Sequence, residues 1–89
     1  MNKRKMLVRL MNNQKNVKYN NFVTLLESFG FELDRTEGSH HIYKNTAIPE
    51  RMNIQNKNGE AKPYQINQFL RLVEKYDLKL YDEEETENA

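Results

Sequence analysis

Two histidines stand side by side in the segment EGSHHIYKN, residues 37–45, and they are the residues best suited to chemistry in a chain without cysteine. Successive side chains of a strand point to opposite faces of a sheet, so His40 and His41 are poorly placed to bind one metal ion together. No pair of Asp or Glu residues stands at ligand spacing nearby. A Ser-His-acid site is not expected either, because Ser39 and His40 are sequence neighbours. We therefore expect no metal and no cofactor.

RNA strand cleavage is a reaction that needs only one imidazole, because the substrate brings its own nucleophile, the ribose 2′-hydroxyl. Histidine titrates near neutral pH and can act as base or acid. A lysine or a helix N-terminus can stabilise the charge that develops on the phosphorus centre. Lys62 directly precedes Pro63, where the last helix is expected to begin, and Lys44 lies on the same strand face as His40. A single histidine at a strand edge is more often structural than catalytic, so these residues alone leave both an enzyme and a binding module open.

The apolar pattern around these residues predicts three helices and three short strands. Stripes at i, i+3, i+4 and i+7 indicate the helices, and alternation indicates the strands. The helices are expected at residues 3–13, 20–29 and 63–76, and the strands at residues 31–35, 40–45 and 51–55. Short connections between the strands require an antiparallel sheet, and a sheet this small must be covered on one face by helices. The predicted class is α+β, a two-layer sandwich with element order α-α-β-β-β-α.

Several residues are expected to fix this arrangement. Gly30 and Phe31 follow the second helix as a left-handed C′ residue and its apolar C″ neighbour, and TEGS at residues 36–39 is expected to form a tight hairpin turn. On the strands, Phe31 and Leu33 alternate with charged residues. The first helix should present one apolar stripe of Met6, Leu7, Leu10 and Met11. The core of the other two helices should consist of Phe22, Leu25, Leu26, Phe29, Ile66, Phe69, Leu70 and Val73.

Length and charge place further limits on the function. A chain of 89 residues has room for one domain with a small core. It has no apolar run near the ~20 residues that cross a bilayer, and its basic start is too interrupted for a secretory signal, so we expect a cytoplasmic protein without membrane contact. The net charge of +1 hides an asymmetry: without the five acidic residues after position 81, the rest carries +6. A basic body suits a polyanionic partner, and the acidic end is expected to be a disordered tail.

Residues 17–78 resemble the HicA family of toxin–antitoxin mRNA interferases. The resemblance is carried by a helix ending in Gly30-Phe31, by GSHHIY at residues 38–43, and by Lys62-Pro63 at the start of the last helix. The chain departs from the common family pattern at Tyr64-Gln65, after Lys-Pro, and at Tyr76-Asp77, where many members have Ala-Gly at the end of that helix. The domains are therefore expected to be a basic amphipathic extension at residues 1–16, the HicA-like domain at residues 17–78 and the acidic tail at residues 79–89.

The resemblance implies a double-stranded-RNA-binding-domain-like fold with a three-stranded sheet. It implies a metal-independent endoribonuclease that acts on mRNA and is neutralised by a HicB-type antitoxin. The family's catalytic histidine maps to His40, its turn glycine to Gly38 and its aromatic core position to Tyr43. His41 falls on a variable position. Ser39, Lys44, Lys57 and Lys62 are the candidate RNA-binding residues beside that histidine.

Two other functions fit the same residues. One is a catalytically silent RNA-binding module that uses lysine and arginine on phosphates. The other is a protein-interaction domain whose basic face meets an acidic partner. The GSHH segment favours the ribonuclease, because binding alone needs no imidazole at that turn.

Overall fold

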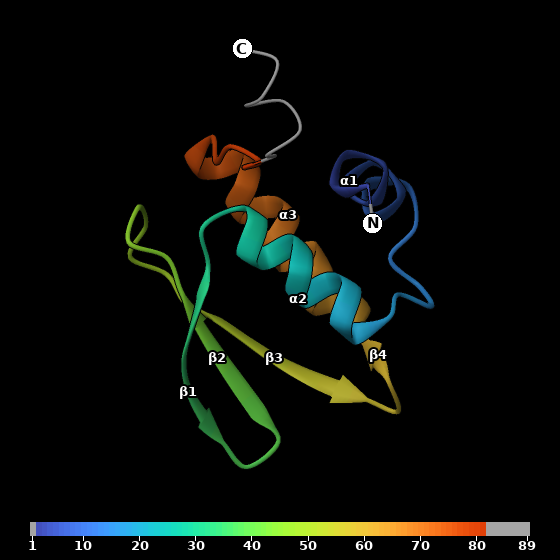
Figure 1. Cartoon of the computed structure of the whole chain (residues 1–89), viewed down its shortest axis with the longest axis vertical. Helices are drawn as coiled ribbons and strands as arrows, with labels where there is room; N and C mark the ends of the chain where they lie inside the picture. Colours follow the sequence, from blue (N-terminus) through green and yellow to red (C-terminus); the bar gives the residue numbers. More distant parts are fainter. Residues whose placement is uncertain (1, 82–89) are drawn as a thin grey trace.

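The computed structural model describes residues 2–81, which fold into three helices and one antiparallel sheet (Figure 1). The acidic residues from Asp82 onward lie outside the described part. The elements follow the chain as α1 (Lys3–Asn12), α2 (Tyr19–Ser28), β1 (Glu32–Glu37), β2 (His40–Lys44), β3 (Met52–Lys57), β4 (Glu60–Ala61) and α3 (Pro63–Tyr76). Neighbouring strands in the sheet are neighbours along the chain, in the order β1-β2-β3-β4. The expected α+β class and the antiparallel sheet are thus confirmed.

The expectation of three strands is wrong, because the chain forms a fourth strand before α3. Asn58 and Gly59 have φ angles of 53° and 87°, which is the pattern of a two-residue type I′ turn. The turn folds Glu60–Ala61 back onto Asn56–Lys57. On its other side β4 meets the segment before α2, where the Ala61 N–H donates to the Val17 carbonyl at 2.9 Å. The short strand therefore ties the entry of α2 to the sheet.

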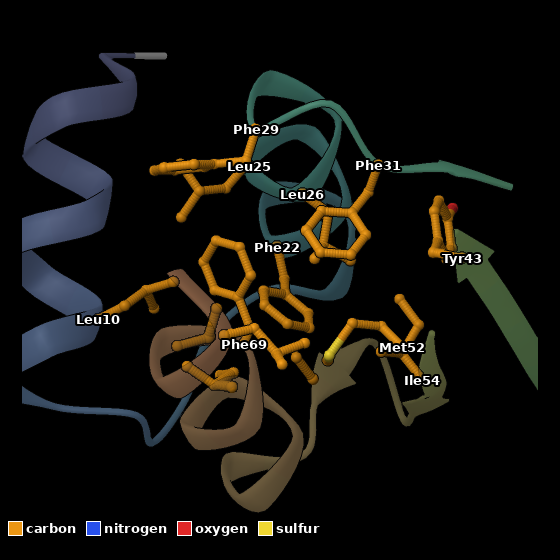
Figure 2. Packing of buried hydrophobic residues seen from close by; sticks show 14 of the residues in the cluster. Leu10, Phe22, Leu25, Leu26, Phe29, Phe31, Tyr43, Met52, Ile54 and Phe69 are labelled. Carbon is orange, nitrogen blue, oxygen red and sulfur yellow. The ribbon is translucent and has the colours of Figure 1, made fainter. Parts of the chain in front are cut away.

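The hydrophobic core lies between the helices and one face of the sheet, and Phe69 of α3 is at its centre (Figure 2). The ring of Phe69 lies 5.4–6.2 Å from the rings of Phe22, Phe29 and Phe31, in edge-on arrangements that aromatic pairs prefer. Met52 and Ile54 of β3 are fully buried beneath these rings. Of the eight expected helix positions, six are buried and Leu70 and Val73 are only partly buried, while Leu72 is buried in their place.

The turn that ends α2 has the predicted geometry. Gly30 has a φ of 94°, the Phe31 N–H donates to the Leu26 carbonyl at 3.2 Å, and the Gly30 N–H donates to the Glu27 carbonyl at 3.0 Å. These are the two hydrogen bonds of a Schellman motif. The motif turns the chain so that Phe31 enters the core directly before β1 begins.

Two of the expected apolar stripes are only partly correct. In α1, Leu10 is fully buried, whereas Met11 is 62% exposed. In β1, Leu33 is 51% exposed although Phe31 is buried. The reason is that β1 lies at one edge of the sheet, whereas the helices make most of their contacts near the opposite edge, at β3 and β4. A register shift between Leu33 and Arg35 also interrupts the alternation that the sequence suggested.

The segment after α3 continues along the core up to the last described residues. Asp77 takes a left-handed φ of 51° at the end of the helix, and the Leu78 N–H donates to the Val73 carbonyl at 3.0 Å. Leu80 packs against the core, and the Tyr81 N–H donates to the carbonyl of Ser28 in α2. Residues 79–81, which the sequence assigned to the tail, therefore lie against the folded body.

Candidate active site

The face of the sheet that is turned away from the helices carries His40, and we call it the open face. Figure 1 shows the described helices on one side of the sheet and the β1–β2 hairpin projecting beyond them. Tyr43, Met52 and Ile54 belong to the core cluster and so define the covered face. Residues one position away point to the other side, and the register pairs His40 with Gln55 and Ile42 with Asn53. His40, Asn53 and Gln55 therefore share the open face.

The turn before β2 sets the position of His40 at the start of the strand. Glu37 and His40 are paired across a two-residue loop of Gly38 and Ser39. Gly38 has a φ of 60° and Ser39 does not have a positive φ, as in a type II′ turn with glycine first. A side chain at position 38 would meet no neighbouring atom, so glycine is favoured there by its backbone conformation. His40 consequently begins the strand as an exposed side chain.

Both nitrogens of the His40 ring lie within hydrogen-bonding distance of amide side chains from β3. Nδ1 is 2.9 Å from Asn53 Oδ1, and Nε2 is 3.4 Å from Gln55 Nε2. Gln55 Nε2 also lies 3.3 Å from Ser39 Oγ. The Asn53 oxygen can only accept a hydrogen bond, so the proton of the neutral ring belongs on Nδ1. Nε2 then keeps a lone pair, which faces the Gln55 amide nitrogen at 3.4 Å.

Lys62 joins this group through Gln55. Its ammonium nitrogen donates to Gln55 Oε1 at 2.7 Å, so one amide separates the lysine from the imidazole. Lys62 is half-buried and stands directly before α3, where Pro63 opens the helix as expected. The positive end of the helix dipole therefore lies beside the lysine. Together they provide positive charge next to a proton-accepting nitrogen.

The other candidate residues lie farther from His40. Lys44 is four residues along β2, about 13 Å at the usual rise of a strand, and its ammonium group is 3.9 Å from Asp34 Oδ1. Asp34 also contacts Arg35 and Arg51. Lys57 is exposed at the end of β3, paired with Glu60 across the turn. The structure thus brings Ser39 and Lys62 to His40 and leaves Lys44 and Lys57 at the margins of the open face.

His41 has a different environment because it points to the covered face. Its ring centroid lies 5.8 Å from that of Tyr19 at the start of α2, and its Nδ1 is 3.4 Å from Thr36 Oγ1. It is half-buried, whereas His40 is exposed. The two histidines are on opposite faces, as the strand period predicted. Among residues 2–81, no three His, Cys, Asp or Glu side chains come together as a candidate metal site.

The sequence prediction missed the amide side chains that surround His40. It also missed Gln65, which supports Gln55: Gln65 is buried, and its Oε1 accepts a hydrogen bond from the backbone N–H of Gln55 at 3.0 Å. The pairing of β3 with β4 begins at Asn56, one residue after Gln55. The side chain of Gln65 therefore bonds the backbone of β3 at the position where β4 no longer does. The alternation of Met52 and Ile54 was the signal that could have indicated these amides. It places Asn53 and Gln55 on the face opposite the core, which is the face of His40.

A family model described as the HicA toxin of bacterial toxin–antitoxin systems matches residues 19–74, which is more than half of the chain. The chain belongs to the HicA toxin family. Comparisons with curated proteins and with solved structures give no match. The HicA match includes α2, the whole sheet and most of α3, and begins after α1.

Membership of the HicA toxin family bears on the partner of this chain and on the position of its site. A toxin of a toxin–antitoxin system implies an antitoxin as its partner. The site with His40, Ser39 and Lys62 lies entirely inside the matched residues. Separately, none of the helices within residues 2–81 has the length and apolar character needed to cross a membrane.

Proposed function

We propose that this HicA toxin is a metal-independent endoribonuclease that cleaves mRNA with a single catalytic histidine, His40. The observation that carries the proposal is the position of that ring: it is exposed on the open face, hydrogen-bonded by Asn53, and one amide away from Lys62. A histidine needed only for packing would be expected on the covered face, where His41 lies beside Tyr19.

The chemistry requires one proton acceptor and one positive group, and the site has both. The ribose 2′-oxygen loses its proton to the imidazole and attacks the adjacent phosphorus. A bond forms between the 2′-oxygen and phosphorus, the bond from phosphorus to the 5′-oxygen breaks, and the leaving oxygen takes a proton from water. The products are a 2′,3′-cyclic phosphate and a 5′-hydroxyl. Lys62 would stabilise the extra negative charge on the phosphate oxygens during the reaction.

RNA as the substrate is supported by charge and by the order of the elements. The chain carries +6 without the acidic residues after position 81, and phosphate neutralisation supplies most of the sequence-independent affinity for nucleic acids. The run from α2 through β1–β3 to α3, with helices on one face, is compatible with a double-stranded-RNA-binding-domain-like fold. Ser39 is the proposed RNA contact beside the reacting phosphate, and Lys44 and Lys57 are the proposed contacts to phosphates at the margins of the open face.

The partner is proposed to be a HicB-type antitoxin that covers the open face. His40 is exposed, so occupying the surface around it is the simplest way to exclude RNA. The positive side chains of this surface would attract an acidic patch on the antitoxin and speed association at low salt. A complex that leaves His40 accessible and still cleaves RNA would contradict this part of the proposal.

Expression of two single-histidine variants in cells tests the function. His40→Ala should be harmless, since a positioned proton acceptor contributes about 10²–10⁴ in rate. His41→Ala is the matched control and should arrest growth and degrade mRNA as the wild type does. Growth and mRNA integrity are followed after induction, and antitoxin binding confirms that both variants fold. If His40→Ala is as toxic as the wild type, a non-catalytic RNA-binding module becomes the better description. If His41→Ala is the inactive variant, the assignment of the histidine is wrong.

A further inference from the structure

The amide groups around His40 carry an inference that rests on the proposed function and goes beyond it. An imidazole can act at Nε2 as a base only when its proton is on Nδ1, so whatever selects the tautomer selects the role. The ring meets an oxygen at Nδ1, Asn53 Oδ1 at 2.9 Å, and an amide nitrogen at Nε2, Gln55 Nε2 at 3.4 Å. Both contacts are satisfied by the same state, the neutral ring with its proton on Nδ1.

We propose that Asn53 is a positioning residue that holds His40 as the Nδ1–H tautomer, so that Nε2 is the general base once the 2′-hydroxyl takes the place of the long 3.4 Å contact from the Gln55 amide. Asn53 does not touch the substrate in this proposal and acts only through the ring. The neutral amide also stabilises the imidazolium less than a carboxylate would, so the proton can leave again after each turnover. Gln55 is the second positioning residue. Its amide nitrogen contacts His40 and its amide oxygen accepts from Lys62, so it keeps the positive group beside the base.

The backbone around Asn53 and Gln55 is held in a way that suits this task. Asn53 lies between the fully buried Met52 and Ile54, so its strand position is fixed by the core. The N–H of Gln55 donates to the side-chain Oε1 of the buried Gln65, which joins β3 to the first turn of α3. Positioning residues must themselves be fixed by neighbouring contacts if they are to fix a catalytic group.

The experiment measures the tautomer and the activity separately. Nitrogen-detected NMR of the His40 ring in ¹⁵N-labelled protein, without substrate and at a pH where the ring is neutral, should place the proton on Nδ1 in the wild type. In Asn53→Ala the signals should shift toward the Nε2–H form, and the kcat for cleavage of an RNA oligonucleotide should fall about tenfold or more with KM little changed. Asn53→Asp should restore the Nδ1–H form and move the acid limb of the pH–rate profile to higher pH, because a carboxylate favours the protonated ring.

Thr36→Val is the matched control, because it removes the polar neighbour of His41 Nδ1. It should leave both the His40 signals and the kcat unchanged. A wild-type ring with its proton on Nε2 would overturn the role of Asn53, and so would Asn53→Ala with the Nδ1–H form and the wild-type kcat. If His40→Ala cleaves RNA as fast as the wild type, the proposed function fails, whatever the tautomer. The two failures are thus distinguishable.

Discussion

At the scale of single residues, the site depends on how close each positive side chain lies to His40. Lys62 donates to Gln55, which in turn contacts the ring. Lys44 is on the same face but faces Asp34, so part of its charge is already balanced within the protein. The two lysines are therefore expected to contribute unequally, although both were candidates from the sequence.

Removing each lysine in turn tests this difference. Lys62→Ala should lower the rate of RNA cleavage by a factor on the order of 10², the typical loss when one donor to a developing negative charge is removed. Lys44→Ala, the control on the same face, should weaken RNA binding slightly and leave the cleavage rate near that of the wild type. Single-turnover rates at saturating RNA measure both effects. Equal losses in the two variants would show that Lys62 acts only as one more basic residue.

How far the site residues could be predicted depended on what the sequence encodes locally. His40 and Gly38 stand in one short motif, and Lys62 marks a helix start, so local signals were sufficient to predict where they lie, whereas the role of His40 came from the family resemblance. Asn53 and Gln55 approach His40 only through the pairing of β2 with β3. The register of that pairing is a tertiary property, set by which residues reach the core, and no local pattern states it.

At the scale of elements, α1 contributes one fully buried side chain to the core, Leu10, while Met6 and Leu7 pack against it partly buried. Leu10 is fully buried in the same cluster as the residues of α2 and α3, although α1 lies before the part that matches the HicA family. Met11, its neighbour, is 62% exposed. The sequence placed both on one stripe because they are adjacent on the helix surface, and only packing against α2 determines which of the two is covered.

This packing predicts unequal costs for two neighbouring substitutions. Leu10→Ala should lower the free energy of unfolding by about 2–5 kcal/mol, as large-to-small changes in a core do. Met11→Ala should change it by no more than about 0.5 kcal/mol, as expected at an exposed position. Urea denaturation followed by circular dichroism measures both. A small effect of Leu10→Ala would mean that α1 is a detachable extension rather than part of the fold.

The helices were predictable from their periodicity, and the fourth strand was not. β4 has two residues, too few for an alternating pattern to be recognised. Its local signal was the Asn58-Gly59 pair, a strong hairpin dipeptide, in a segment expected only to connect the third strand to the last helix. Its second partner, the segment around Val17, is more than forty positions away along the chain, so its pairing there could not be inferred locally.

At the scale of the whole molecule, two tyrosines packed between sheet and helix couple stability to alkaline pH. Burial, and after it the charge of an ionised Tyr43, together raise the pKa of Tyr19 from 10.0 to about 12. The pKa of Tyr43 is also raised, first by burial and then by Glu27. In the unfolded chain the tyrosine hydroxyls ionise with a pKa of about 10. Between about pH 10 and pH 12 the unfolded state therefore loses tyrosine protons that the folded state keeps. Stability from these groups is complete below that window and falls as the pH rises through it.

Tyr19→Phe should remove part of this alkaline loss. The wild type and the variant are compared by urea denaturation at pH 9 and pH 11, and the decline in unfolding free energy between the two should be smaller for the variant. A decline of the same size in both would show that other groups govern alkaline unfolding.

The α+β class of the whole molecule was predictable from the sequence, because the order of the apolar stripes was enough to predict two layers.

The proposal that His40 takes the proton of the 2′-hydroxyl in a metal-independent RNA cleavage is tested most directly by the chemical ends of the product. Purified wild-type toxin is incubated with RNA in the presence of EDTA, and the fragment ends are identified by mass spectrometry. The wild type should produce 2′,3′-cyclic phosphate and 5′-hydroxyl ends at an undiminished rate, and His40→Ala should produce neither. Cleavage that stops in EDTA, or that continues in His40→Ala, would contradict the claim.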